Sequence, residues 1–257
     1  MKDSVDRLVQ DGFSSLLSSL VQQIGNVSDE SGTGATTNVV GMSTIGQPMN
    51  NKNTAPNGSS TPIQEEEILV IDCNDAFFVK DETFKAIHMN RELCNDPDIV
   101  EWDLTVYAKL RELIVGSGCL QYVRGLCLKG FRGLERVVVN DDCFTESEGS
   151  FEVSDCKRLK SIVIGSGCCL SWSSFVMSNC GASLCFGDGC FSLSGDGSFE
   201  VTNCKGMSTL KMGSGCCANW SSFTLSNCGV SEVIVDGECF VSCRSVVFES
   251  ERWCVVS

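Results

Sequence analysis

The sequence predicts a β-rich solenoid of about seven turns, with two short strands in each turn that stack in parallel on the next turn. The main observation is a seven-residue pattern that begins with Ser-Phe and ends with Cys. Its phenylalanines are 24 residues apart at every step, and its four copies are 150–156, 174–180, 198–204 and 222–228. Weaker copies are centred on Trp102, Leu126 and Val246. Such repeats are typical of solenoids, in which each turn covers the apolar face of the next.

A second pattern runs in phase with the first and supplies the other strand of each turn. It has the form Leu-x-x-Ile-x-Ile and ends a few residues later at a cysteine. Its copies begin at Leu110, Leu134, Leu159, Leu184, Met207 and Val230. Alternating apolar residues over so few positions indicate short strands with one buried face. At the usual strand spacing of about 4.8 Å, seven turns make a rod about 30 Å long.

The two linked patterns resemble the BspA-like leucine-rich repeats of bacteria and protists. The resemblance covers about residues 87 to 251 and makes the predicted fold leucine-rich-repeat-like. It departs from that family where proline is preferred after the first strand: this chain has Gly116, Asn140, Gly165, Gly187, Gly213 and Asp236. The family implies a parallel-stranded solenoid that serves protein–protein contact or adhesion.

Three regions are expected. Residues 65–257 form the solenoid, with an N-terminal cap to about residue 100, and residues 25–64 form a disordered linker rich in Gly, Ser, Thr and Asn. Residues 1–24 form an amphipathic helix whose apolar side chains are Val5, Val9, Phe13, Leu16, Leu20 and Ile24. Acidic residues interrupt its start, so it does not resemble a signal peptide. No segment is long and apolar enough for a membrane span, and we expect a cytoplasmic protein.

Most of the 18 cysteines recur once per turn. Cys119, Cys143, Cys168, Cys190, Cys216 and Cys239 close the first strand, and Cys156, Cys180, Cys204 and Cys228 close the second. A position that recurs in every turn favours free thiols buried in the core over a disulfide framework. Adjacent pairs such as Cys168-Cys169 are expected to point one sulfur inward and one outward if the backbone is extended. No Cys-x-x-Cys pair occurs, so no metal site is predicted.

Few residues suit catalysis, and we expect neither an enzyme nor a bound cofactor. The single histidine, His88, is expected at the surface or in the cap, and the glycines of Gly165-Ser166-Gly167 lack the lysine and helix of a phosphate loop. One alternative is a carbohydrate-acting parallel β-helix, although no acidic cluster recurs on one face. Small-molecule binding is not expected.

The net charge of −14 argues against nucleic acid and anionic lipid as partners. A local exception is the basic set Lys109, Arg111, Arg124, Lys129, Arg132 and Arg136. It is either a solvated face or a docking site for an acidic segment, such as Glu65-Glu66-Glu67 of the chain itself.

One residue between the last two core positions of each first strand is predicted to point outward. These residues are Ile114, Val138, Val163, Cys185, Lys211 and Ile234. Outward positions of sheets are normally polar, so an apolar row indicates an interaction surface, unless the β-branched residues are there only for their strand propensity.

The predicted function is therefore a non-enzymatic module that binds a protein partner, with a cell-surface adhesion or structural repeat protein as the other alternative. The candidate partner-binding residues are Ile114, Val138, Val163 and Ile234, with Arg124, Lys129, Arg132 and Arg136 as a second group. A competing possibility is that the helix of residues 1–24 folds back over the row and hides it.

Overall fold

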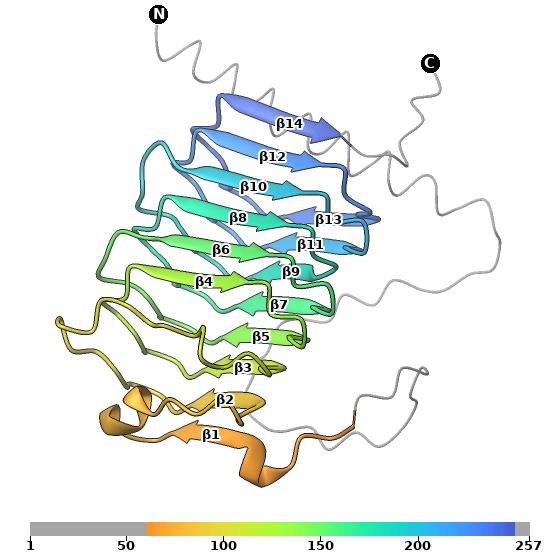
Figure 1. Cartoon of the computed structure of the whole chain (residues 1–257). Helices are drawn as coiled ribbons and strands as arrows, with labels where there is room; N and C mark the ends of the chain where they lie inside the picture. The colour runs from red at the N-terminus through yellow and green to blue at the C-terminus, as the bar shows by residue number, and fades with distance from the viewer. Residues whose placement is uncertain (1–60, 250–257) are drawn as a thin grey trace, which may run out of the picture.

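The computed structural model describes residues 61–249, which form a parallel β-solenoid of two facing sheets (Figure 1). The long sheet has eight strands: β1 (Ile68–Ile71), β2 (Ala86–Met89), β3 (Glu112–Val115), β5 (Arg136–Val139), β7 (Ser161–Ile164), β9 (Ser183–Phe186), β11 (Thr209–Met212) and β13 (Glu232–Val235). The short sheet has six: β4 (Gly125–Lys129), β6 (Ser150–Ser154), β8 (Ser174–Ser178), β10 (Ser198–Thr202), β12 (Ser222–Ser226) and β14 (Ser245–Glu249).

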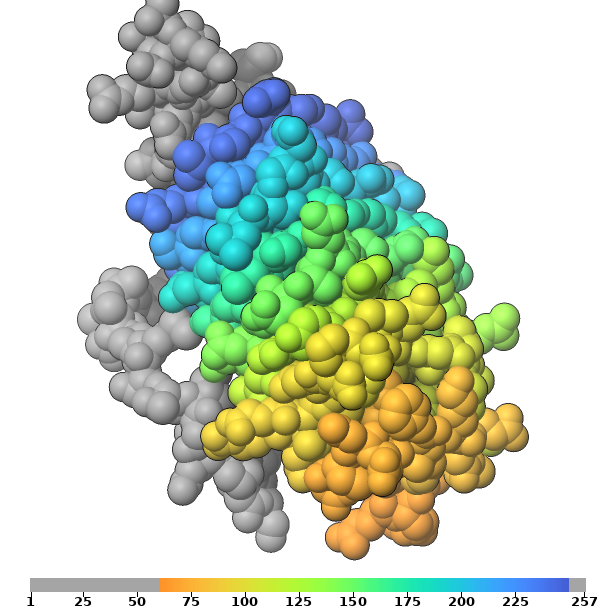
Figure 2. Space-filling view, turned by 90° about the vertical axis from the view of Figure 1, so that its left-hand side faces the viewer, coloured from red at the N-terminus to blue at the C-terminus, as the bar shows by residue number. Residues whose placement is uncertain are grey.

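Two short 3-10 helices, η1 (Glu65–Glu67) and η2 (Asn74–Phe78), flank β1 at the N-terminal end of the described solenoid. Within residues 61–249, no helix has the length and apolar character needed to cross a membrane. The helix predicted for residues 1–24 lies outside the described residues, and so does the linker predicted for 25–64 except for its last four positions. The space-filling view shows the turns succeeding one another along the axis (Figure 2).

A file of phenylalanines runs through the core, as the 24-residue period predicts. Phe151, Phe175, Phe199 and Phe223 pair in register on neighbouring strands of the short sheet and are all buried. Their ring centroids are 5.3, 4.9 and 5.2 Å apart along the file. The weaker copies at Leu126 and Val246 continue this register in β4 and β14. The copy at Trp102 is buried but forms no strand, so the short sheet starts one turn later.

The recurring cysteines lie in two buried files beside this core. In the first file each thiol points at a turn carbonyl of the preceding coil: Cys143 Sγ is 3.0 Å from the oxygen of Gly116, and Cys168 Sγ is 3.0 Å from that of Asn140. A small thiol thus fills the corner and donates a weak hydrogen bond to a carbonyl that strand pairing does not use. The predicted buried positions are confirmed, and the reduced state of these thiols remains a prediction.

The expectation for adjacent cysteines is wrong, because the backbone is not extended there. Cys169 and Cys217 have positive φ angles of 55° and 51°, which turn both sulfurs of each pair into the core. The same left-handed position holds phenylalanine in the alternate turns, namely Phe144, Phe191 and Phe240. Non-glycine residues seldom adopt this conformation, so close packing must hold them in it.

A two-turn alternation of large and small residues accompanies these left-handed positions. Turns with cysteine there carry a buried tryptophan, Trp172 or Trp220, and the turn before each has Gly149 or Gly197 at the facing position. The Trp220 ring lies 5.0 Å from that of Phe191, and the Trp172 ring lies 4.9 Å from that of Phe144. The packing unit of the core is thus two turns, although the strand repeat is one.

Candidate interaction surface

The outward row forms one continuous file across the long sheet. Strand register places Ile114 beside Val138, Val138 beside Val163, and Val163 beside Cys185. Lys211 and Ile234 continue the file on β11 and β13. All four apolar side chains from Ile114 to Cys185 are half-buried, and Ile234 is 37% exposed. The predicted display of these residues on one sheet face is therefore confirmed.

The short sheet differs at the equivalent positions. Its outward middle file is Cys127, Glu152, Val176, Glu200, Thr224 and Val247, in which apolar and polar side chains are mixed. Serine or threonine occupies most of the outward positions beside this file, as at Ser174, Ser198 and Ser222. Both sheets have the same strand geometry, so strand propensity alone does not account for four consecutive apolar residues on the long sheet.

Charged side chains border the row on the side where the strands of the long sheet begin. Glu112 lies between two partners, with its carboxylate 2.8 Å from His88 Nε2 and 3.5 Å from an Arg136 guanidinium nitrogen. His88 thus lies on the outward face of β2, in line with the row. This is the surface position that the sequence predicts for it.

A cluster of four charged residues, hereafter the Glu135 cluster, lies next to Arg136. The Glu135 carboxylate is 2.8 Å from Lys160 Nζ, 3.2 Å from Arg111 Nη2 and 3.4 Å from Arg158 Nη2. The side chains of Arg111 and Glu135 are only 18% and 14% exposed. One carboxylate therefore joins three cations beside the apolar row.

The N-terminal end of the described chain crosses this border. Arg111 Nη1 donates a 2.7 Å hydrogen bond to the carbonyl of Thr61, which precedes it by 50 residues. Ile63 lines an open depression of about 260 Å³ together with Arg111, Glu112, Glu135, Arg136, Lys160 and Ser161. Thr61 and Ile63 therefore lie beside the turns that lead into β3, β5 and β7 of the long sheet.

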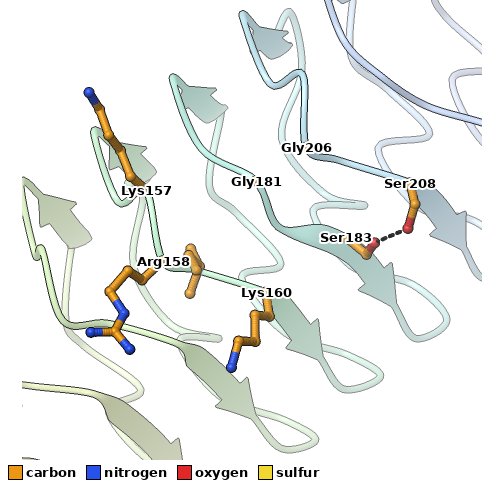
Figure 3. A pocket seen from close by; sticks show the side chains of 8 residues that line it. Lys157, Arg158, Lys160, Gly181, Ser183, Gly206 and Ser208 are labelled. Carbon is orange, nitrogen blue, oxygen red and sulfur yellow. Dashed lines mark hydrogen bonds between the residues drawn. The ribbon is translucent and has the colours of Figure 1, made fainter. Parts of the chain in front are cut away.

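A second depression, of about 450 Å³, lies farther along the same edge (Figure 3). Its lining includes Gly181 and Gly206, and a β-carbon on Gly206 would come within 3.1 Å of the Gly181 α-carbon. The hydroxyls of Ser183 and Ser208 bond each other at 2.9 Å. Arg158 and Lys160 also line it, but both form ion pairs with Glu135, and Lys157 extends in another direction in Figure 3. The depression is therefore open, and its cations do not converge on one point.

The predicted basic set is not one patch. Arg124 immediately precedes β4 and Lys129 ends it, and both line a depression of about 410 Å³. Lys129 Nζ is 2.7 Å from the Glu152 carboxylate. Arg132 lies in the turn after β4, and Arg136 begins β5 of the long sheet.

One residue of the acidic segment considered as an occupant of the basic set pairs with a lysine outside that set. Glu67 pairs with Lys85, and this hydrogen bond holds the pKa of the Glu67 carboxyl below its usual value. Arg111 also attracts the Glu67 carboxylate, while its own ion pair is with Glu135, and Arg136 pairs with Glu112.

Among the residues from 61 to 249, no three His, Cys, Asp or Glu side chains are grouped so that they could hold a metal ion. The cysteines of this range are free, and most are buried. Desolvation raises the pKa of Cys94 to about 12 and that of Cys119 to about 11. Such thiols are inert at neutral pH, which suits a structural role. Comparisons with models of known protein families, with curated proteins and with solved structures gave no match.

Proposed function

We propose that this protein is a non-enzymatic binding module that contacts a partner protein through the outward row of the long sheet. The observation that carries the proposal is the contrast between the two sheets. Four consecutive outward residues of the long sheet are apolar, whereas polar residues interrupt the equivalent file of the short sheet. A contiguous apolar strip on a solenoid face is typical of protein interaction sites.

The charges around the row support the same proposal. Protein interfaces commonly combine an apolar centre with a polar rim that fixes orientation and excludes wrong partners. Here Glu112, Arg136 and the Glu135 cluster supply such a rim on one side. From Ile114 to Ile234 the row crosses five strand steps, or about 24 Å, which is long enough for several contacts with one partner.

The proposal extends to a BspA-like leucine-rich-repeat protein of the cytoplasm. The linked repeat patterns support the family, and the files of buried free thiols suit a reducing compartment. Trapping thiols with an alkylating reagent during cell lysis tests the compartment. Free cysteines in the protein as isolated are the expected result, and a set of native disulfides would contradict it.

Replacing Val138 and Val163 together with threonine tests the binding surface. Threonine keeps the strand propensity and removes apolar contact area, so the fold should change in stability by less than about 0.5 kcal/mol. The matched control is Val176→Thr, because Val176 is also half-buried but lies on the outward face of the short sheet. Proteins captured by the full chain from a lysate are then compared quantitatively among the wild type and both variants.

A partner that binds through the row should be captured equally by the wild type and the Val176→Thr control. Its recovery should fall at least tenfold with the double variant, since a few central apolar contacts tend to dominate an interface. Equal recovery with all three proteins would exclude the long-sheet face. Selective loss with Val176→Thr would instead place the binding surface on the short sheet.

A further inference from the structure

We propose that the first edge of the short sheet, at β4, binds an extended segment of a partner protein, which adds to the sheet as a further strand. The short sheet begins at β4, and among the described strands β4 pairs only with β6. In Figure 1 the chain just before β4 runs as a coil and not as a strand. This edge is separate from the outward row of the long sheet and gives the module a second binding surface beyond the proposed function.

The turn before β4 leaves its backbone out of the short sheet. Trp102 occupies the position that phenylalanine has in the later turns, and its ring lies 5.5 Å from that of Phe77. After it, the Asp103 carboxylate accepts a 3.0 Å hydrogen bond from the N–H of Thr105. A side chain that takes a backbone N–H in this way competes with strand pairing. The segment therefore turns there instead of pairing with β4.

The edge of β4 presents backbone donors and acceptors to this gap. Successive residues of a strand direct their N–H and C=O groups to opposite edges. The N–H of Gly130 donates to the Ser154 carbonyl of β6 at 2.8 Å, which fixes the direction of every second residue before it. Gly125, Cys127 and Lys129 therefore direct their backbone groups away from β6, to the free edge.

No backbone hydrogen bond joins the described residues 101–105 to residues 125–129. The two turns meet just before, where the Arg124 N–H donates to the Val100 carbonyl at 2.9 Å. The depression of about 410 Å³ lies between the two segments, and the three edge residues of β4 line it. Its volume is within the range of ordinary ligand sites. An unpaired strand edge of this kind is a template for another strand.

The side chains of β4 leave its edge accessible. Gly125 has no side chain, and Cys127 is small and exposed. The Lys129 side chain extends toward β6, where its Nζ is 2.7 Å from the Glu152 carboxylate. Lysine on an edge usually discourages strand addition, and here the ion pair with β6 draws the cation away from the edge.

The unpaired backbone groups and the charges around them define the occupant. Alternating N–H and C=O groups along a strand edge are matched by the backbone of another extended polypeptide. The lining carries the cations Arg124 and Lys129 on the β4 side and the anions Glu101 and Asp103 on the other. A strand that pairs with β4 lies next to the cations, so acidic side chains suit it. The other edge of β4 already shows this pairing, in the contact of Lys129 with β6.

The experiment uses the full-length protein and a synthetic peptide with the sequence of residues 148–155. This peptide is acidic and contains β6, a strand that already pairs with β4. Its binding is measured by fluorescence anisotropy, and hydrogen exchange of the protein amides is followed by NMR. The test variant is Cys127→Pro, which removes one N–H from the edge and is tolerated where that N–H has no partner. The control is Cys127→Ser, which keeps the N–H.

Peptide binding should be saturable, and Cys127→Pro should weaken it at least tenfold while Cys127→Ser leaves it within twofold. In the free protein the amides of Cys127 and Lys129 should exchange rapidly, and the peptide should slow their exchange at least tenfold. No saturable binding to the wild type, or equal binding to the proline variant, would overturn the proposal. Slow exchange of these amides in the free protein would also overturn it, because another part of the chain or a second copy would then cover the edge.

A change in the peptide gives the same test without altering the protein. Methylation of every second amide nitrogen blocks one edge of the peptide strand, and shifting the methyl groups by one residue blocks the other edge. One methylated peptide should lose binding at least tenfold and the other should keep it, because only one edge pairs with β4. Equal affinities of the two would contradict strand addition. These measurements do not involve Val138 or Val163, so their outcome is independent of the proposed function of the long-sheet row.

Discussion

The indole ring of Trp220 lies directly over Gly197 of the preceding turn. A β-carbon added to Gly197 would come within 2.4 Å of Trp220 Cδ1 and Nε1. The buried Trp220 N–H has no acceptor among the described residues, so the indole contributes by filling volume. Glycine is thus required at position 197 because the Trp220 ring leaves no room for a side chain. The φ angle of Gly197 is not positive, so backbone conformation does not require glycine there.

Gly197→Ala should lower the free energy of unfolding by about 1–3 kcal/mol, because the methyl group must displace the ring in a close-packed core. Urea denaturation measures the change. The matched control is Gly195→Ala, since a β-carbon there meets no atom within 4 Å. In the background of Trp220→Leu the cost of Gly197→Ala should largely disappear, and strictly additive losses would contradict the packing relationship.

Phe199 is the central test of the phenylalanine file. Its ring lies between those of Phe175 and Phe223, at 4.9 and 5.2 Å. Phe199→Ala should cost about 3–5 kcal/mol through lost burial and a residual cavity, which chemical denaturation can measure. Truncating Leu193, which is 66% exposed, is the control and should change stability by less than about 0.5 kcal/mol. Equal midpoints for the two variants would refute the buried file.

The 24-residue period was enough to predict the phenylalanine file and the outward row, because parallel register repeats every side-chain direction from turn to turn. It did not predict the alternation of Phe144, Cys169 and Phe191. These residues have a left-handed backbone conformation, and phenylalanine and cysteine do not indicate that conformation in a sequence. A signal was present in the sequence: from Cys143 to Cys239, the residue after each cysteine of the first file alternates between phenylalanine and cysteine.

Proximity in the sequence was a poor guide to the charged residues. Arg124 and Arg136 are half a turn apart, so the solenoid places them on different sheets. Arg111 and Glu135 are 24 residues apart, which is one full turn, and their side chains meet. Matching charged residues that are one 24-residue period apart would have predicted the Glu135 cluster. Grouping basic residues that are close in the sequence did not predict it.

The buried thiols predict how stability depends on pH. Burial raises the pKa of Cys119 to about 11 and that of Cys94 to about 12, from about 9 in the unfolded chain. The folded state then holds its thiol protons more tightly, so this stability is present below pH about 9 and is lost as the pH rises through the folded values. Denaturation midpoints in the presence of a reductant should be level from pH 7 to 8 and fall from pH 9 to 10.5. A Cys119→Ala variant should show a shallower fall, and an equally steep one would show that other groups cause it.

Glu135→Gln should destabilise the protein, because Arg111, Arg158 and Lys160 would then lie close together without the carboxylate that joins them. Since Glu135 and Arg111 are largely buried and the other two cations are exposed, we expect a loss of about 1–2 kcal/mol at low salt. Salt screens the remaining repulsion, so the loss should shrink when the urea denaturation is repeated in 1 M NaCl. Glu92→Gln is the control: its pair with Arg91 is exposed on both sides and should contribute less than about 0.5 kcal/mol. A loss for Glu135→Gln that does not depend on salt would mean that the carboxylate acts by packing and hydrogen bonding and not by balancing the three cations.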